Sequence, residues 1–304
     1  MNFAPPKIRA LLLAFGMFSL SANAPASEAY LVAEAGEGLV LVAKNESQPR
    51  QVASLTKIAA VLVALEWCVE KKIDPEQWTF DVPAAAIRGG ANPLGLRGGD
   101  VLTLATGLRA AMMASDNTST HAFAEAIGRE MSGEGDGVAR FVGHMNALAA
   151  RLGMMDTRFV NPHGLDEGAE RGVSTAADLA RLSLAALDRP GFLDYGSERE
   201  REVSFLRDGQ EVKVKLANTN ELVASRGIDG MKTGTTRLSG PCLIATATRD
   251  LSRDGGSVTK RLVVVVLAAE DRFRDAVLLL DQGWSILGGA GGGETKERLR
   301  KVED

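Results

Sequence analysis

The chain has 304 residues, of which 45% are hydrophobic, so it can bury the core of one large domain or of two lobes that share an interface. Its formal net charge of −4 argues against nucleic acid as a partner, because nucleic-acid binding favours a clustered basic surface. The two cysteines, Cys68 and Cys242, lie in apolar segments. We expect them to be small core residues rather than a disulfide.

Residues 1–24 have the pattern of a secretory signal peptide. Lys7 and Arg9 precede an apolar run over residues 10–22, and small residues lead to a cleavage site near Ala24. Retention as a membrane anchor is the alternative, but the run is too short to span a bilayer comfortably. Cleavage would remove two positive charges and leave 280 residues with a net charge of −6. We therefore expect a periplasmic or secreted protein with no membrane anchor.

The segment that follows predicts a β-hairpin and then helices. Strands over residues 30–35 and 38–43 flank a Gly-Glu turn. The run over residues 58–65 is apolar on every face, which is typical of a buried helix. Further helices are expected over three ranges, 103–113 with Thr103 as its N-cap, 121–129 and 141–152.

The C-terminal third returns to strands and closes with a helix, over the ranges 242–248, 261–268 and 274–287. The polar stretch 249–256 is expected to be a turn. Strands at both ends of the chain enclose a helical middle. The sequence therefore predicts an α+β fold, an α/β sandwich whose antiparallel sheet combines N- and C-terminal strands and is interrupted by a helical insertion. A catalytic domain over residues 28–287 would precede a Gly-rich linker and charged tail, 288–304.

A serine and a lysine stand three residues apart where the apolar helix is expected to begin. Ser54 and Lys57 would lie on one helix face, one turn apart. A serine hydroxyl needs a base to remove its proton, and a buried lysine can be that base, because an apolar setting lowers its pKa. The helix N-terminus adds a backbone N–H that stabilises developing negative charge. A capping serine beside a solvent-facing lysine is the alternative for this motif alone.

Ser115, Asp116 and Asn117 stand between two expected helices. A loop at this place can present a hydroxyl and an amide to a cleft. Ser115 would pass a proton to a leaving amine, and Asn117 would hold a substrate backbone through its donor and acceptor. An ordinary helix-joining turn favours the same residue types and is the alternative.

Lys232, Thr233, Gly234 and Thr235 begin an expected strand, which a turn over residues 238–241 follows. Lys232 would supply a fixed positive charge and Thr233 a hydroxyl, which together suit a C-terminal carboxylate. Gly234 would allow a substrate to approach the strand closely. An exposed edge strand that carries a lysine is the alternative.

The three motifs occur in one order in an exported chain, and no competing catalytic set is present. A second Ser-x-x-Lys string, Ser257 to Lys260, adjoins the expected polar turn. The histidines at 121, 144 and 163 lack a metal-ligand spacing such as HExxH, and there is no GxSxG nucleophile elbow. The sequence therefore favours a serine acyl-transfer enzyme that uses no metal.

With these motifs the chain resembles the serine D-alanyl-D-alanine carboxypeptidases, the low-molecular-mass penicillin-binding proteins. The resemblance covers nearly all of residues 28–287. It includes the segments Ala53 to Lys57, Leu152 to Thr157, Asn161 to Leu165, Asn218 to Asn220 and Asp229 to Thr236. It implies a β-lactamase/transpeptidase-like fold and no cofactor.

The resemblance also implies a two-step mechanism on the stem peptide of peptidoglycan. Ser54 would attack the D-Ala-D-Ala bond with Lys57 as its base, while the backbone N–H groups of Ser54 and Thr235 form the oxyanion hole. The leaving carboxylate would lie at Thr233 and near Arg272, and β-lactams would act as covalent inhibitors. The implied site has catalytic Ser54, Lys57 and Ser115 and substrate-binding Asn117, Lys232, Thr233, Gly234, Thr235 and Arg272.

Two departures from the family pattern leave alternatives open. Asp116 stands where the family usually has glycine. The resulting Ser-Asp-Asn motif resembles that of the class A β-lactamases. Those enzymes need a glutamate in a Glu-x-x-x-Asn pattern, and none occurs between Asn117 and Lys232. No second domain follows residue 287, as in relatives that are DD-endopeptidases and cut peptidoglycan cross-links. A catalytically silent peptidoglycan-binding protein is the third alternative.

Overall fold

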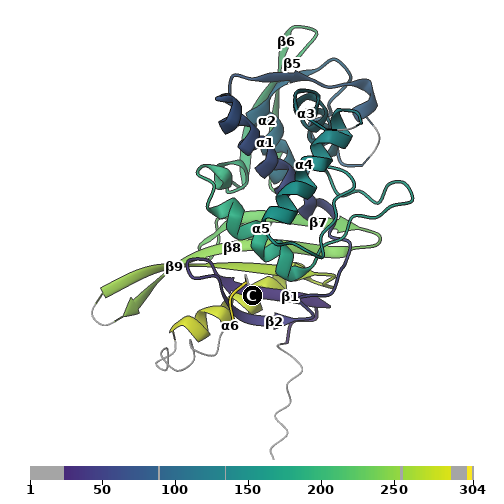
Figure 1. Ribbon diagram of the computed structural model, residues 1–304. Coiled ribbons are helices and arrows are strands. Elements are labelled where there is room, and N and C mark those ends of the chain that lie inside the picture. Colours follow the sequence, from purple (N-terminus) through teal and green to yellow (C-terminus); the bar gives the residue numbers. More distant parts are fainter. Residues whose placement is uncertain (1–23, 88–89, 134, 254–255, 289–299, 303–304) are drawn as a thin grey trace, which may run out of the picture.

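The computed structural model describes residues 24–87, 90–133, 135–253, 256–288 and 300–302. Figure 1 shows a sheet with helices on both faces and, beside it, a helix-rich lobe that carries a second, smaller sheet. The expected signal peptide, apart from Ala24, and most of the expected linker and tail lie outside the described residues. Within the described part, no helix is both long and apolar enough to cross a membrane.

The main sheet joins the two ends of the chain, which confirms the predicted α+β architecture. Its strand order is β2-β1-β9-β8-β7, and every neighbouring pair is antiparallel. β7 is an edge strand, so alternate backbone N–H and C=O groups along it face away from the sheet. The strands are β1 (Ala29–Glu34), β2 (Leu39–Lys44), β7 (Ile228–Thr236), β8 (Gly240–Arg253) and β9 (Gly256–Leu267).

Both faces of the sheet are buried, because side chains along each strand alternate between two apolar clusters. In β1, Leu31 and Ala33 belong to the cluster that includes α1 and α5, whereas Val32 belongs to the cluster that includes α6. Accordingly, α5 and α6 lie on opposite sides of the sheet (Figure 1). The helices are α1 (Lys57–Lys71), α2 (Leu104–Met113), α3 (Asn117–Glu130), α4 (Gly137–Arg151), α5 (Ala176–Leu187) and α6 (Arg272–Gly288).

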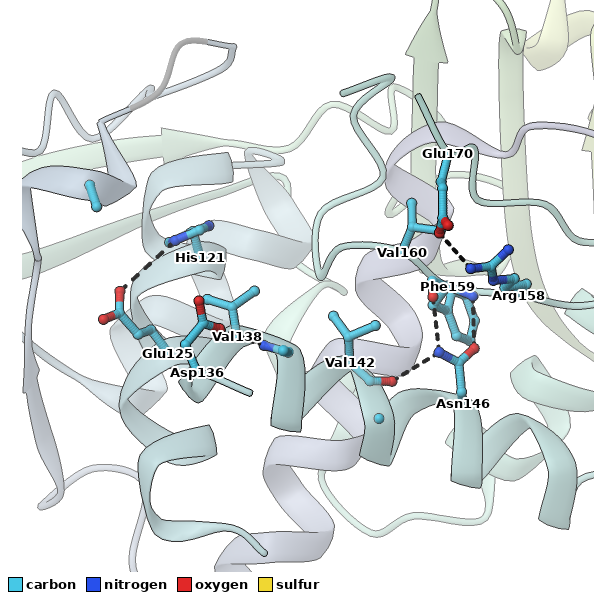
Figure 2. Close-up of a pocket in the computed structure, with 13 residues that line it drawn as sticks. His121, Glu125, Asp136, Val138, Val142, Asn146, Arg158, Phe159, Val160 and Glu170 are labelled. Atoms are coloured by element: carbon cyan, nitrogen blue, oxygen red, sulfur yellow. Dashed lines mark hydrogen bonds and ion pairs between the residues drawn. The ribbon is translucent and has the colours of Figure 1, made fainter. Parts of the chain in front are cut away.

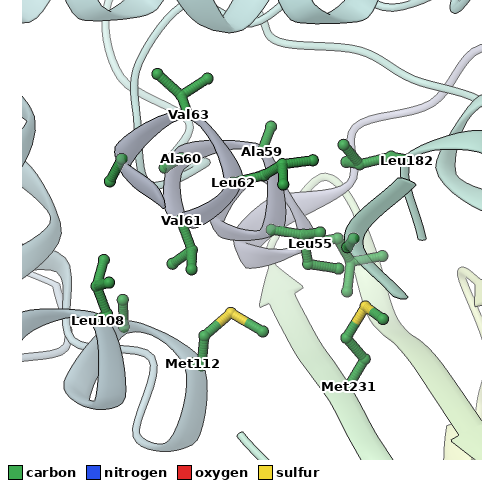
Figure 3. Packing of buried hydrophobic residues seen from close by; sticks show 14 of the residues in the cluster. Leu55, Ala59, Ala60, Val61, Leu62, Val63, Leu108, Met112, Leu182 and Met231 are labelled. Atoms are coloured by element: carbon green, nitrogen blue, oxygen red, sulfur yellow. The ribbon is translucent and has the colours of Figure 1, made fainter. Parts of the chain in front are cut away.

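Helix α1 runs through the core and is buried on every side over residues 57–65, as its continuous apolar pattern predicts. Figure 3 shows Val61 of α1 pointing toward Leu108 and Met112 of α2. Cys68 of α1 and Cys242 of β8 are both buried and free, which confirms that they are core residues. Because α1 is packed on every side here, the side chain of its first residue, Lys57, is held in a fixed position.

The helices of the middle region begin at acceptor side chains that cap them. Thr103 accepts a hydrogen bond from the Thr106 backbone N–H at 3.2 Å, which confirms it as the N-cap of α2. Helices α3 and α4 each begin four residues before the predicted start, because Asp116 and Asp136 cap them. Asn117 therefore lies in the first turn of α3 rather than in a loop.

The second sheet was not predicted from the sequence. Its order is β3-β4-β5-β6, with β3 (Thr79–Asp81), β4 (Val101–Thr103), β5 (Glu200–Arg207) and β6 (Gln210–Ala217). The first two strands have three residues each, and the other two carry many charged residues. Asp208 and Gly209 both have positive φ, 51° and 75°, and the Asp-Gly pair is a hairpin signal that the sequence contained.

Two boundaries near the C-terminal strands differ from the prediction. The reversal between the two strands falls within the predicted stretch 249–256, but most of that stretch is strand, because β8 continues to Arg253 and β9 begins at Gly256. Leu251 is paired to Val258. This hairpin projects beyond the rest of the sheet (Figure 1), where polar side chains on both faces meet water. β7 begins at Ile228, four residues before the predicted start, and its turn to β8 ends at Ser239.

The described part of the charged tail lies along the main sheet. The Val302 backbone N–H donates to the Gly38 carbonyl at 2.7 Å, and the Val40 N–H donates to the Arg300 carbonyl at 2.9 Å. Val302 is buried and packs into the core.

We predict that Phe123→Ala lowers the free energy of unfolding by about 3–5 kcal/mol, because it leaves a cavity in a packed core. Phe123 is fully buried on α3 and contacts the rings of Phe80 and Phe141. Met155→Ala is the control, since Met155 is 84% exposed, and we expect a change within about 0.5 kcal/mol. Urea denaturation measures both, and equal losses would contradict the packing described.

Candidate active site

Ser54 and Lys57 stand at the junction of a short 3-10 helix, Ala53–Thr56, with α1. The Lys57 Nζ lies 2.9 Å from the Ser54 Oγ, so the two side chains share one face as predicted. Ala53, directly before the serine, has φ of 48°, in the left-handed region that is costly for a residue with a Cβ atom. Strain at this position is consistent with a backbone held for function rather than for stability.

The Lys57 amine is closed off from water and has polar neighbours on three sides. It is fully buried, and its Nζ lies 2.7 Å from the Asn117 Oδ1 and 3.0 Å from the His163 carbonyl oxygen, in addition to Ser54. A neutral amine has two N–H donors and one lone pair. If the two donors go to Asn117 and His163, the lone pair faces the Ser54 hydroxyl.

Burial lowers the pKa of Lys57 to about 7, although the negative charge of Asp116 acts in the opposite direction. An ammonium group at this place would lose its hydration, so the neutral form is favoured. The buried lysine expected from the sequence is therefore present, with a pKa close to neutral pH.

Asp116, the residue that departs from the family pattern, holds the turn between α2 and α3. It is fully buried, and one carboxylate oxygen accepts the Ser119 N–H at 2.8 Å while the other accepts the Leu94 N–H at 3.2 Å. Burial raises the pKa of Asp116, which these hydrogen bonds and Lys57 partly offset. The structure thus gives Asp116 a capping role that explains an aspartate here without any β-lactamase chemistry.

The other two members of this motif flank that cap. The Asn117 side chain reaches Lys57, and its backbone N–H donates to the Ala91 carbonyl at 2.7 Å. Ser115 is half-buried and has φ of 60°, in the left-handed region like Ala53. Two of the non-glycine residues with positive φ, Ala53 and Ser115, therefore lie next to or within the motifs identified in the sequence.

The third motif lies on the edge strand β7, which packs against the 3-10 helix that carries the serine. A Cβ atom at Gly234 would lie 3.0 Å from the Ser54 backbone nitrogen, so a larger residue here would push against the backbone that carries the serine. Thr233 is buried and its Oγ1 lies 2.6 Å from the Thr219 Oγ1. Thr219 also donates through its backbone N–H to the Met113 carbonyl at 2.8 Å, which ties β7 to the end of α2.

Two basic residues, Lys232 and Arg272, lie at β7, and Lys232 differs from the fixed positive charge that the sequence predicts. Lys232 is fully buried, and its Nζ donates to the Thr233 carbonyl at 3.0 Å. Burial, together with the positive charges of Lys57 and Arg272, lowers the pKa of Lys232 well below its usual value. A carboxylate bound beside this amine would raise its pKa again. Arg272 donates from Nη1 to the Gly234 carbonyl at 3.0 Å and to the Thr235 Oγ1 at 2.8 Å.

The segment 161–165 contributes contacts to which the sequence analysis assigned no role. The His163 main-chain carbonyl accepts from Lys57, and a main-chain contact leaves no side-chain signal in a sequence. Asn161 shapes this loop, because its Oδ1 accepts from the Gly164 N–H at 2.6 Å and its Nδ2 donates to the Leu165 carbonyl at 2.9 Å. Gly164 has φ of 81°, and a Cβ atom there would lie 1.9 Å from the Ala53 carbonyl oxygen.

The described residues contain no group of three or more His, Cys, Asp and Glu side chains that could hold a metal ion. What the site does contain is a serine hydroxyl next to a buried amine, an edge strand against the same serine, and two further basic side chains, Lys232 and Arg272. These groups can deprotonate a hydroxyl and bind a carboxylate, which is the chemistry of acyl transfer.

We predict that Gly164→Ala slows covalent labelling of Ser54 by a fluorescent penicillin about 100-fold, since the new methyl group displaces the loop from Ala53 and moves the His163 carbonyl. Gly168→Ala is the matched control. Gly168 has a similar φ of 67°, but no atom lies within 4 Å of its Cβ position. Circular dichroism checks that both variants are folded, and equal labelling rates in the two would contradict the role given to this contact.

Comparisons with known proteins agree with this geometry. D-alanyl-D-alanine carboxypeptidase DacF of Bacillus subtilis is 32% identical over 256 residues, which are 83% of this chain and 60% of that protein. A D-alanyl-D-alanine endopeptidase of Pseudomonas aeruginosa is 31% identical over 73% of this chain and 67% of its own length. The chain spans about three fifths of the length of DacF and of two similar curated carboxypeptidases, DacC of Escherichia coli and DacD of Salmonella typhimurium.

Solved structures and the family comparison agree with these relatives. A penicillin-binding protein of Listeria monocytogenes, solved with cefotaxime bound, superposes with a TM-score of 0.68 at 28% identity and covers 86% of this chain and 98% of its own. The family described as D-alanyl-D-alanine carboxypeptidase matches residues 17–270. The chain therefore belongs to the D-alanyl-D-alanine carboxypeptidase family of serine peptidases.

Proposed function

We propose that this protein is a periplasmic or secreted serine D-Ala-D-Ala carboxypeptidase, which removes the terminal D-Ala from peptidoglycan stem pentapeptides. The observation that carries the proposal is the Lys57 amine, fully buried and 2.9 Å from the Ser54 hydroxyl. A family that acts on D-Ala-D-Ala and the apolar, basic pattern of the first 24 residues support the substrate and the compartment.

Acylation begins at Ser54. Its Oγ attacks the carbonyl carbon of the D-Ala-D-Ala bond as its proton passes to the neutral Lys57 Nζ. The backbone N–H groups of Ser54 and Thr235 stabilise the oxyanion. This pairing is supported by the close packing of Gly234, the residue before Thr235, against the Ser54 nitrogen. Asn117 holds the Lys57 amine through its Oδ1, which leaves the amide Nδ2 for the substrate backbone.

The leaving D-Ala needs a proton on its nitrogen and a counter-charge for its carboxylate. Ser115 relays the proton toward the nitrogen with the help of Lys232. Thr233 donates its hydroxyl to the carboxylate, and Arg272 contributes positive charge beside it. The carboxylate raises the pKa of Lys232 on binding, because it supplies the anion that the buried amine lacks in the free enzyme. Substrates that end in a carboxylate are favoured for this reason.

Water then releases the acyl-enzyme and restores Ser54. A β-lactam enters the same reaction, since its ring amide takes the place of the D-Ala-D-Ala bond and its carboxylate takes the place of the terminal one. The opened ring stays attached to Ser54, so β-lactams are covalent inhibitors of this protein. The cefotaxime-bound Listeria relative supports this part of the proposal.

Cleavage of peptidoglycan cross-links is a second candidate. A curated relative of similar identity is named a D-alanyl-D-alanine endopeptidase. The chemistry at Ser54 is the same, and only the leaving amine differs. Cross-linked muropeptide dimers distinguish the two activities, because a carboxypeptidase leaves them intact.

We predict that Ser54→Ala abolishes both D-Ala release from a pentapeptide muropeptide and covalent labelling by penicillin, because no other hydroxyl replaces the nucleophile. Ser257→Ala is the matched control. Ser257 also precedes a lysine by three residues, but it is exposed on β9 and its lysine, Lys260, pairs with Glu34 at 3.0 Å. Mass spectrometry measures both reactions. Labelling that persists in Ser54→Ala would overturn the assignment.

A further inference from the structure

The first turn of α6 contains a carboxylate that is closed off from water and incompletely paired. Asp275 is fully buried, and its Oδ2 accepts two hydrogen bonds, whereas its Oδ1 has no hydrogen-bond partner within the part of the chain that the structure describes. The Arg274 Nη1 lies 3.6 Å from Oδ1, on a side chain that is 45% exposed. The helix N-terminus offsets part of the cost of burying this charge, but a close counter-ion would stabilise it further.

Other recessed carboxylates have close partners. Three of them, Glu125, Asp136 and Glu170, line a cavity of about 600 Å³ between α3, α4 and the segment 158–160 (Figure 2). Glu170 pairs with Arg158, and Glu125 pairs with Arg129. Asp136 caps α4 through its Oδ1. Of the buried carboxylate oxygens in the described residues, only the Oδ1 at the start of α6 lacks a hydrogen-bond donor.

Both donors to Asp275 come from one residue, Ser27, which lies two residues before β1. The Ser27 backbone N–H donates to Oδ2 at 2.8 Å, and its hydroxyl donates to the same oxygen. Ser27 is fully buried, and its carbonyl accepts from the Lys44 Nζ at 2.9 Å. The next residue, Glu28, donates through its N–H to the Ala268 carbonyl at 3.3 Å. The Ser27 nitrogen is therefore fixed beside the carboxylate by contacts that do not involve the residues before it.

Those preceding residues form the end of the expected signal peptide. Small residues at positions −3 and −1 of a cleavage site occur twice here, in the strings Ala22 to Ala24 and Ala24 to Ala26. Ala24 and Ala26 are exposed, whereas Ser27 is buried, so the folded domain begins directly after the second string. Cleavage at that string would make Ser27 the first residue of the mature protein.

We propose that the exported chain is cleaved after Ala26, and that the α-ammonium group of Ser27 is then the counter-ion of Asp275. Hydrolysis of the Ala26–Ser27 peptide bond adds one water, which leaves a carboxylate on the leader and an amine on Ser27 that takes up a proton. The amide supplied one N–H donor and no charge, whereas the ammonium supplies three donors and a positive charge at the same nitrogen. One donor keeps the bond to Oδ2, and another is available to Oδ1. The inference rests on the proposed export of the chain.

This ion pair links maturation to stability. Asp275 lies in the first turn of α6, which begins at Arg272, and Ser27 leads into β1, so the pair joins the start of the helix to the start of the sheet. The precursor has only an amide at this place. The mature chain is therefore the more stable form, and it gains the difference when the leader is removed.

The first residue of the protein purified after export of the full chain tests the cleavage site. We expect intact mass and N-terminal sequencing to show Ser27. Ala26→Leu should prevent this cleavage, because the residue at −1 must be small, whereas the matched variant Ala22→Leu should leave it unchanged, since Ala22 belongs only to the first string. A mature protein that begins at Pro25, or one that retains its leader, would overturn the inference.

Thermal unfolding tests the ion pair itself. Two forms, one that begins at Ser27 and one that begins at Ala24, are released from a cleavable N-terminal fusion. We expect Tm to be about 5–10 °C higher for the Ser27 form, as for a buried charge that gains its partner in a domain of this size. Asp275→Asn should remove this difference. Asp281→Asn is the matched control and should preserve it, since Asp281 is an exposed residue of the same helix.

Equal Tm values for the two forms would overturn the ion pair, and so would a difference that Asp275→Asn leaves intact. Circular dichroism checks that every variant is folded before it is heated. Neither experiment measures turnover, so a protein that behaves as expected here but releases no D-Ala would support the inference and contradict only the proposed activity.

Discussion

Removal of one lysine amine from water is the constraint on which the rest of this site depends. A buried ammonium ion is costly unless a counter-ion accompanies it, so the Lys57 amine favours its neutral form. Two acceptors, the Asn117 amide oxygen and the His163 carbonyl, then orient the neutral amine toward Ser54. Burial keeps the Lys57 amine neutral, so that it can accept a proton, and the two hydrogen bonds orient its lone pair toward the Ser54 hydroxyl. The site needs both.

The fold provides this burial by placing α1 through the middle of the core, with its first residue at the boundary between the helical lobe and the main sheet. Three segments then converge on the stretch from Ala53 to Lys57. The edge strand β7 packs on the serine through Gly234, the 161–165 loop packs on Ala53 through Gly164, and the start of α3 reaches Lys57 through Asn117. A methyl group at Gly164 would displace its loop, and one at Gly234 would press on the Ser54 backbone.

The sequence was informative where a pattern depends on side chains and less so where it depends on the backbone. The all-round apolar run identified α1 as buried, and motif spacing identified Ser54, Lys57 and Asn117, which the structure brings into contact. The His163 carbonyl could not be found this way, because any residue has one. The charged strands β5 and β6 were missed although Val212, Val214 and Leu216 of β6 alternate with polar residues, which is a strand signal. The lowered pKa of Lys232 follows from burial that its neighbours in sequence do not reveal.

The most direct test of this account is the second-order rate of penicillin acylation between pH 5 and 10. Lys57 acts as a base only when neutral, and its pKa is lowered to about 7. The rate should therefore rise about tenfold per pH unit below that value and level off above it, as for a single ionisation of the free enzyme. A rate that continues to rise to pH 10 would show that Lys57 titrates as an ordinary lysine, and it would contradict the claim that burial creates the base.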